Sequence, residues 1–342
     1  MTNASPSRRV LLTGALGNLG RTTMAALLEE GHAVRAFDLP TKANRRAAKK
    51  LPPGVEIVFG DVTDASACAE AVRGVDAIVH LAALTPPATE RMPEIARKVN
   101  VEGTRNLVRA AEAEGRPIRF IQASSYSIYG PDAGWNGLVT ADTPVVATDV
   151  YTETKIATEE ILRSSSLDWV IFRIAAAVEG SGLAADKVVL SIIFEVHPEQ
   201  PIELVHGKDV ARAAAHAVTA EEASRRVFPI GGGPSCQLRQ RDVFAMTERM
   251  LGIEPLPPEA FGKSRYYTSW LDTSESERVL RFQRHTAKDI ERDLEKRIAW
   301  LKPLIFPVRP LVRRFFLSLS GPYRGEPARP TWQAQLERYS ER

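Results

Sequence analysis

The chain of 342 residues is long enough for one large α/β domain with a smaller lobe. Its apolar fraction of 44% and charged fraction of 25% are typical of a globular protein and exclude disordered, collagen-like and coiled-coil classes. A net charge of +3 and only two cysteines, Cys68 and Cys236, give no reason to expect a nucleic-acid partner, a disulfide framework or a metal site.

The first two-thirds of the chain alternate short apolar runs with longer helical patterns. The segment before the first run is polar and basic and lacks the apolar core of a signal peptide, so we expect a cytoplasmic protein. Strands that alternate with helices pair in parallel, so the pattern predicts a doubly wound parallel Rossmann sheet. The predicted strands are Val10–Thr13, Ala33–Asp38, Val55–Phe59, Ala77–Leu81, Phe120–Ala123 and Val170–Ile174. The predicted helices are Arg21–Glu30, Ala65–Val72, Ile95–Ala113 and Val150–Ser164.

After Arg173 the pattern becomes mixed, which is typical of a smaller substrate lobe. A helix near Asp209–Val218, a strand at Val227–Ile230 and a helix near Asp242–Leu251 are expected there. We therefore divide the chain into an NAD-binding core at 1–175, to which segments near 206–232 return, a substrate lobe at 176–290, and a C-terminal extension at 291–342.

A glycine pattern joins the first strand to the first helix. Gly14, Gly17 and Gly20 follow the spacing G-x-x-G-x-x-G in this turn, as a loop that cradles a pyrophosphate requires. Gly14 and Gly17 would let the backbone approach the phosphates, and Gly20 would let the helix pack closely. An ordinary strand–helix turn is the alternative.

Two aspartates follow the next strands. Asp38 lies twenty-four residues after Gly14, where a carboxylate accepts the adenosine ribose hydroxyls and repels a 2′-phosphate, which favours NAD over NADP. Lys42, Arg45 and Arg46 could instead reach a phosphate, although we interpret them as the solvated face of a helix. Asp61 is placed to meet the adenine edge, with a helix N-cap as the equal alternative.

Tyr151 and Lys155 lie four residues apart, on one face of a predicted helix after the fifth strand. A free tyrosine has a pKa near 10, and we expect the lysine cation to lower it so that the phenol exchanges a proton with a substrate hydroxyl. The ammonium would also hold the nicotinamide ribose. Ser124 or Ser125, where the fifth strand ends, would polarise the substrate oxygen.

Taken in order, these segments resemble the extended short-chain dehydrogenases/reductases, which include NAD-dependent epimerases and dehydratases and 3β-hydroxysteroid dehydrogenases. The similarity covers about residues 8–290 and also includes His80–Ala83, Asn100–Thr104, Asp209–Ala211 and Ile230–Gly233. The resemblance implies Ser125, rather than Ser124, as the catalytic serine, with Tyr151 and Lys155. It implies cofactor contacts at Gly14, Gly17, Asn18, Leu19, Gly20, Asp38, Asp61, Val62, Leu81, Ala82, Ala83, Asn100, Tyr151 and Lys155.

The sequence departs from the family at three positions near the substrate. Glu153 stands where a basic residue is common, Ile174 replaces a proline, and Glu179 replaces a tyrosine. Nucleotide-sugar members usually carry an arginine that grips the diphosphate, and Ile202 occupies that place here. Arg239 or Arg241 could substitute, but more simply they decorate a helix. We therefore expect a weakly charged or hydrophobic substrate.

The C-terminal extension is apolar and basic. Three prolines and four cations in 298–317 argue against a membrane-spanning helix, but the segment could lie on a membrane surface. Packing against the protein itself or a dimer partner is the alternative, and we expect a homodimer.

The predicted function is thus an NAD-dependent oxidoreductase that interconverts a secondary alcohol and a ketone. One alternative is a nucleotide-sugar epimerase or dehydratase that recycles NAD. A second alternative is a non-catalytic regulator that senses NAD(P), which the Tyr151–Lys155 pair disfavours.

Overall fold

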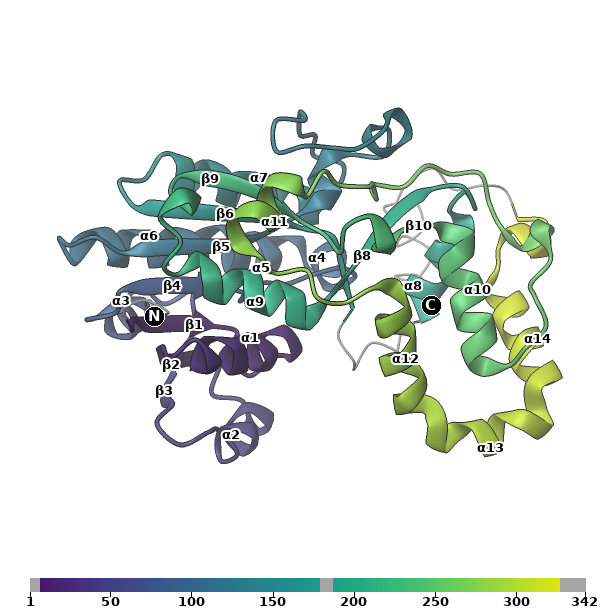
Figure 1. Ribbon diagram of the computed structural model, residues 1–342, viewed down its shortest axis with the longest axis horizontal. Coiled ribbons are helices and arrows are strands. Elements are labelled where there is room, and N and C mark those ends of the chain that lie inside the picture. The colour runs from purple at the N-terminus through teal and green to yellow at the C-terminus, as the bar shows by residue number, and fades with distance from the viewer. Residues whose placement is uncertain (1–6, 179–186, 327–342) are drawn as a thin grey trace.

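A parallel sheet of seven strands forms the centre of the computed structural model, which describes residues 7–178 and 187–326 (Figure 1). Every pair of neighbouring strands in it is parallel, which confirms the predicted doubly wound fold. The strands lie in the order β3-β2-β1-β4-β5-β6-β9. Their bounds are β1 Arg9–Thr13, β2 Ala33–Asp38, β3 Glu56–Phe59, β4 Ala77–His80, β5 Arg119–Ser125, β6 Asp168–Ile174 and β9 Arg226–Ile230.

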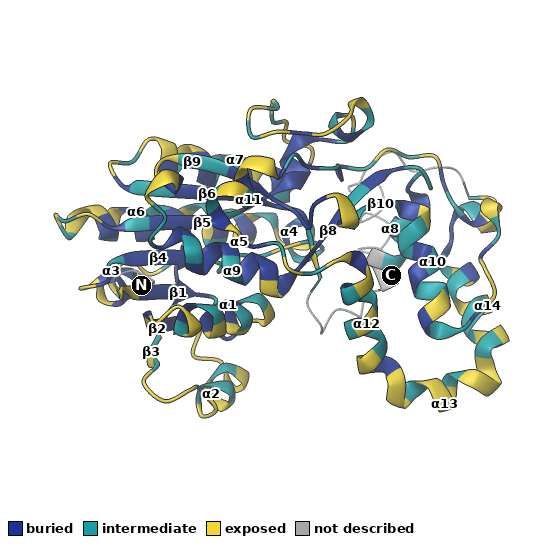
Figure 2. Cartoon of the chain, in the orientation of Figure 1, coloured by how far each residue is buried: buried dark blue, intermediate teal, exposed yellow. Residues whose placement is uncertain are grey.

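Helices cover both faces of this sheet because its strands alternate their side chains between two apolar clusters. Val10 and Leu12 of β1 join the cluster under helices α1 and α9, whereas Leu11 joins the cluster under α3, α6 and α7. Figure 2 shows the resulting buried centre between exposed helix surfaces. The helices run α1 Asn18–Glu29, α3 Ala65–Val72, α6 Gly103–Ala113, α7 Val150–Arg163 and α9 Gly207–Ala217.

The helix predicted at Ile95–Ala113 is interrupted. Two short helices, α4 Ala88–Arg91 and α5 Pro93–Arg97, lead into a π-helical turn, Lys98–Glu102, which continues into α6. A π-turn of this kind inserts an extra residue and rotates the side chains that follow. Here it carries Asn100, whose contacts are described below.

A smaller sheet of mixed direction begins after β6, as predicted. Its three strands lie in the order β10-β8-β7, with β7 parallel and β10 antiparallel to β8. Helix α11, Ser274–Leu280, packs onto α9 and β9. This segment therefore lies against the large sheet, although it follows the small sheet in the sequence. The other bounds are β7 Ala176–Val178, β8 Pro201–His206, β10 Gln237–Arg239, α8 Lys187–Glu195, α10 Gln240–Leu251, α12 Ala287–Ile298, α13 Lys302–Ile305 and α14 Arg309–Leu319.

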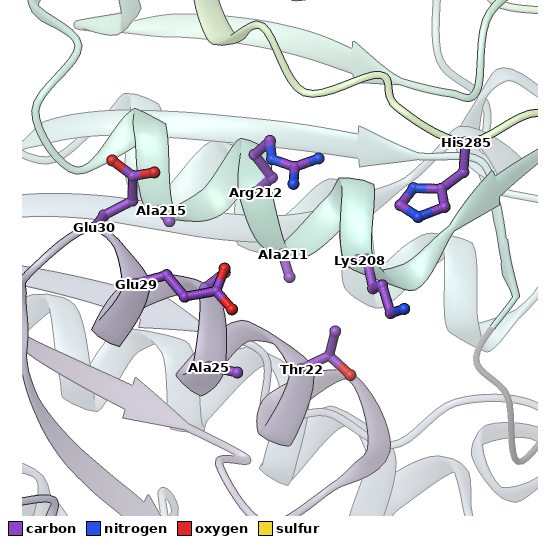
Figure 3. A pocket seen from close by; sticks show the side chains of 10 residues that line it. Thr22, Ala25, Glu29, Glu30, Lys208, Ala211, Arg212, Ala215 and His285 are labelled. Carbon is purple, nitrogen blue, oxygen red and sulfur yellow. The ribbon is translucent and has the colours of Figure 1, made fainter.

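Helices α1 and α9 are in contact, and a hollow of about 330 Å³ opens between them. Figure 3 shows Ala25 of α1 and Ala211 and Ala215 of α9 among its lining residues. Glu29, the last residue of α1, and Glu30, which caps it, lie toward one end of this hollow. The hollow lies between these two helices, and the glycine turn does not line it.

A buried ion pair ties α7 to the sheet. The Glu159 carboxylate accepts hydrogen bonds from the Arg173 guanidinium of β6, at 3.1 and 2.9 Å, and from the Ser124 hydroxyl of β5 at 2.5 Å. Arg173 also donates to the carbonyl of Ala141 and lies over the ring of Tyr129. Glu159 also pairs with Arg163 at 2.8 Å, so removing the Glu159 carboxylate would leave the buried Arg173 without its carboxylate partner, whereas removing Arg173 would leave Glu159 with one cation.

A second buried carboxylate joins the two sheets without a cation. Glu203 of β8 accepts hydrogen bonds from the backbone N–H of Gly233 and Leu271, at 3.0 and 2.7 Å, and from the amide of Gln237. A side chain at Gly231 would collide with this carboxylate. Burial raises the pKa of Glu203 to about 7, against which the three hydrogen bonds act.

This raised pKa predicts a stability that falls as the pH rises. The folded carboxyl keeps its proton up to about pH 7, whereas the unfolded chain releases it near 4.5, so the folded protein loses stability across that window. The loss is on the order of 3 kcal/mol. In urea denaturation at several pH values, Glu203→Gln should gain stability relative to the natural chain as the pH rises through the window. Parallel curves for the two proteins would contradict this prediction.

Candidate functional site

A cleft of about 360 Å³ opens at the carboxyl ends of strands β1 to β4. The strand order reverses between β1 and β4, and open α/β sheets bind ligands at such a point. The cleft brings together eight of the predicted cofactor residues: Gly14, Gly17, Asp38, Asp61, Val62, Leu81, Ala82 and Ala83. Seven further residues line it that sequence reasoning missed: Leu16, Phe37, Leu39, Asn44, Gly60, Leu84 and Val99.

The glycine turn has the geometry that a dinucleotide needs. Gly14 has a φ of +64°, and a Cβ there would lie 3.0 Å from the backbone nitrogen of Ala82. At Gly20 a Cβ would lie 2.1 Å from the carbonyl oxygen of Gly14, so only glycine permits this close packing of α1 on the turn. Gly17 is the N-cap of α1, so Asn18, Leu19 and Gly20 form its first turn, whose free N–H groups favour a phosphate.

Asp38 lies at the edge of the cleft and holds the glycine turn. Its carboxylate accepts hydrogen bonds from the backbone N–H of Leu16 at 2.9 Å and of Leu39 at 2.8 Å, and from the Asn44 amide at 2.9 Å. Asn44 belongs to helix α2, Lys42–Ala48, which carries the three cations that we interpreted as a solvated helix face. Arg45 lies over the ring of Phe59 and donates to the carbonyl of Pro40. These contacts occupy Arg45 and leave the negative charge of Asp38 at the cleft.

Asp61 is not a helix cap. Its carboxylate accepts a hydrogen bond from the backbone N–H of Thr63 at 2.8 Å, whereas Asp64 caps α3 through the N–H groups of Ser66 and Ala67. The N-cap alternative for Asp61 is therefore wrong, because the chain turns once more before the helix begins. Asp61 lines the cleft instead.

Asn100 connects the cleft to helix α7. Its side chain accepts from the N–H of Leu84 at 2.8 Å and donates to the Leu84 carbonyl and to the hydroxyl of Thr154. Leu84 lines the cleft, and Thr154 immediately precedes Lys155. The buried amide thus works as a packing group that fixes a cleft loop to α7.

Ser125, Tyr151 and Lys155 meet beside this connection. Ser125, at the end of β5, hydrogen-bonds the phenol of Tyr151 and lies 2.8 Å from the hydroxyl of Ser127. The Lys155 ammonium lies 5.6 Å from the centre of the Tyr151 ring and donates to the carbonyl of Ala123 at 2.7 Å. Ser124 points into the Glu159 pair instead, which agrees with the choice of Ser125.

The pKa of Tyr151 does not follow our expectation. We expected Lys155 to lower it, but burial raises it to about 12, and the hydrogen bond from Ser125 only partly opposes this. Burial lowers the pKa of Lys155 to about 8, which Glu159 partly offsets. The difference arises because both groups are enclosed by protein, a property that residue spacing does not reveal.

The start of α7 is held by two carboxylates. Asp149 forms a capping box with Thr152, at 2.7 and 3.0 Å. Glu90 of α4 accepts from the backbone N–H of Val150 at 3.3 Å and of Tyr151 at 3.1 Å. Burial and the neighbouring Asp149 raise the pKa of Glu90. No sequence signal identified Glu90, because its contact spans sixty residues.

Two of the sequence departures are explained. Glu153, which stands where the family commonly has a basic residue, forms a bidentate ion pair with Arg97 of α5. The negative charge at this position therefore has a partner. Ile174 ends β6, paired with Ser125 on one side and Ile230 on the other. Glu179 lies outside the described residues.

A model of the NAD dependent epimerase/dehydratase family matches residues 10–231, which hold nearly all of the seven-stranded sheet. The chain belongs to this family. The description of this family as NAD dependent agrees with the predicted cofactor.

Proteins similar to this chain align with different shares of its length. The 3 beta-hydroxysteroid dehydrogenase/Delta 5-->4-isomerase of Mycobacterium tuberculosis (strain CDC 1551 / Oshkosh) is 33% identical over 218 residues, 60% of this chain and 55% of that protein. The chain thus spans about half the length of the curated relatives it matches first. A short-chain dehydrogenase/reductase superfamily protein from Agrobacterium tumefaciens, crystallised with NAD, shares the fold at a TM-score of 0.71 and 23% identity, covering 86% of this chain and 99% of that one. The dTDP-glucose 4,6-dehydratase DesIV from Streptomyces venezuelae shares it at 0.69 and 24%, with the same coverage.

The charge of Asp38 predicts a preference between dinucleotides. NAD should bind at least about tenfold more tightly than NADP, because a 2′-phosphate would meet the carboxylate. Asp38→Asn should narrow this gap while keeping an acceptor for Leu16, whereas Asp38→Ala should also weaken NAD binding by freeing the turn. Fluorescence titration of both dinucleotides measures this. Equal or tighter NADP binding by the natural chain would contradict the assignment and implicate Lys42, Arg45 or Arg46.

Proposed function

We propose that this family member interconverts a secondary alcohol and a ketone on a weakly charged, hydrophobic substrate, with Tyr151 as the proton-transfer group. The observation that carries the proposal is the contact of Ser125, Tyr151 and Lys155 beside the cleft. Ser125 would hold the substrate oxygen, and Lys155 would turn from the Ala123 carbonyl to the nicotinamide ribose. The proposal also includes the division of the chain into an NAD-binding core, a substrate lobe and a C-terminal extension. It includes a homodimer as well, which light scattering would test.

The proton and the hydride leave the alcohol by separate routes. Bound NAD supplies the hydride acceptor for the carbinol carbon. In reduction, the protonated phenol of Tyr151 gives its Oη proton to the oxygen of the new alcohol and becomes a phenolate; in oxidation, that phenolate takes the hydroxyl proton while the C–O single bond becomes the carbonyl. Burial favours the protonated phenol, so before oxidation Tyr151 must release its own proton to solvent, and the Lys155 ammonium beside the ring would stabilise the phenolate.

Aromatic side chains from the substrate lobe support an apolar substrate. Tyr266 and Tyr267 stack at 4.2 Å and cluster with Ile192 of α8. Burial mainly raises the pKa of Tyr267, and Tyr266 and Tyr151 contribute further. The contribution of Tyr151 indicates that this cluster lies near the reacting phenol. If this cluster borders the substrate, its aromatic faces would suit an apolar ring system.

The three positions considered for a diphosphate clamp are engaged in other contacts. Ile202 packs against the apolar cluster that includes Met246 and Met250. Arg239 donates to the carbonyl of Glu199 at 2.7 Å and lies over the ring of Trp270, and Arg241 pairs with the Glu199 carboxylate. These engaged arginines support an oxidoreductase over a nucleotide-sugar epimerase.

The substrate class can be tested directly. The hydroxysteroid dehydrogenase of M. tuberculosis makes 3β-hydroxysteroids the first compounds to offer with NAD, read as NADH fluorescence. UDP- and dTDP-hexoses serve as the second panel. Net NADH from a steroid or another apolar alcohol supports the proposal, whereas converted nucleotide sugars without net NADH would replace it with epimerisation or dehydration.

Removing the phenol should separate chemistry from cofactor binding. Tyr151→Phe should lower turnover by about a thousandfold or more while NAD binding stays unchanged, because only the proton-transfer group is lost. Lys155→Met should weaken both turnover and NAD binding. Tyr323→Phe, at an exposed tyrosine, is the matched control. If Tyr151→Phe kept most of its activity on a substrate found as above, the mechanism would be wrong.

Glu90 should affect turnover through the position of Tyr151. Glu90→Ala should lower kcat about tenfold without changing NAD binding, because two backbone N–H groups at the start of α7 lose their carboxylate acceptor. Glu90→Gln keeps the carbonyl acceptor and should recover most of kcat. Glu94→Ala on the neighbouring helix is the control. A fall in thermal stability alone, with kcat unchanged in Glu90→Ala, would count against a positioning role.

A further inference from the structure

A row of exposed apolar side chains follows α12. Trp300, Leu304, Phe306 and Leu311 are 63 to 71% exposed, and Phe315 is 42% exposed; we name these five residues the tail surface. They lie on α13, the first part of α14 and the turns around them, where Figure 2 shows a largely exposed ribbon. Large apolar side chains gathered in this way mark a surface that meets something other than water.

The segment is anchored to the rest of the protein at both ends. Ile298 is buried in the cluster with Met246 and Met250, and Leu317 is buried with Phe194 and Phe244. Ser320 adds a buried hydrogen bond to the carbonyl of Ala260 at 2.7 Å. The position of the tail surface between these two ends is thus part of the packed fold. Deleting the segment would expose these clusters as well, which makes substitutions the better probes.

The segment that carries the tail surface is basic, although Lys296, Lys302 and Arg324 pair with the flanking Asp293, Glu295 and Glu326. From Lys296 to Gly325 the sequence contains no acidic residue, and it holds seven cations: Lys296, Arg297, Lys302, Arg309, Arg313, Arg314 and Arg324. Arg309 lies 4.1 Å over the ring of Phe306, which places a cation directly beside an exposed aromatic ring. Lys302 makes a surface contact with Glu295, and Arg314 is exposed. This combination attracts an anionic, partly apolar partner.

We propose that the tail surface docks on a bilayer that contains anionic lipids. The apolar side chains would enter the boundary between headgroups and acyl chains, and the cations would meet lipid phosphates and carboxylates. The segment would lie on the membrane rather than cross it: every helix in residues 7–178 and 187–326 is too short or too polar to span a bilayer. A second copy of the chain fits less well, because two such surfaces would bring like charges together.

Vesicle co-sedimentation of the full chain tests the proposal. The probes are vesicles of phosphatidylcholine alone and of phosphatidylcholine with phosphatidylserine. The chain should sediment with the anionic vesicles and lose binding as salt rises. Trp300→Ser combined with Leu304→Ser and Phe306→Ser should weaken binding by about tenfold or more, and so should Lys302→Glu with Arg314→Glu.

Matched controls separate this surface from general stickiness. Ile95→Ser with Leu138→Ser removes exposed apolar side chains elsewhere, and Lys49→Glu with Lys50→Glu removes two cations of the turn after α2; both should bind vesicles as the natural chain does. Unchanged NAD binding verifies folding of every variant.

Four outcomes would overturn the proposal. The folded chain could fail to sediment with anionic vesicles, the tail variants could bind as well as the controls, or the tail variants could turn a dimer into a monomer, which assigns the surface to a second copy. Vesicle binding that appears only when the chain is shortened to end at Glu326 would show that the last sixteen residues, rather than a bilayer, cover the tail surface. None of these results depends on which substrate the enzyme uses.

Discussion

The buried pair of Glu159 and Arg173 is the interaction on which the reactive groups depend. Glu159 lies one turn after Lys155 on α7, and its carboxylate meets side chains of β5 and β6. Taking two charges out of water is costly, so the pair contributes more to arrangement than to net stability. By fixing α7 against the ends of these strands, it allows the phenol, the serine and the ammonium to meet at one point.

The cofactor cleft and the reactive groups are joined through few contacts. Asn100 binds a cleft loop and α7 at once, and it sits in the π-helical turn that aims it inward. Asp38 performs a similar task at the other end, because it holds the glycine turn and presents charge to the cleft. A cofactor bound in this cleft would therefore contact a loop that is hydrogen-bonded, through Asn100, to the helix that carries Tyr151 and Lys155.

The sequence predicted the parts of the fold that follow from local pattern. The strands of the large sheet, the glycine turn and the Tyr151–Lys155 spacing are all written within short segments, and the structure has them nearly at the predicted bounds. Contacts between distant segments were not predictable in this way: Glu90 at the start of α7, Asn44 on Asp38 and the cap at Asp64 rather than Asp61 each depend on how the chain turns between elements. The direction of the Tyr151 pKa was missed for the same reason, since burial is a property of the whole fold.

The burial of Tyr151 has a consequence for the direction of the proposed reaction. A group whose pKa is raised to about 12 gives its proton away readily but is a poor proton acceptor at neutral pH. Reduction of a ketone therefore asks less of this phenol than oxidation of an alcohol, for which the neighbouring Lys155 ammonium must stabilise the phenolate.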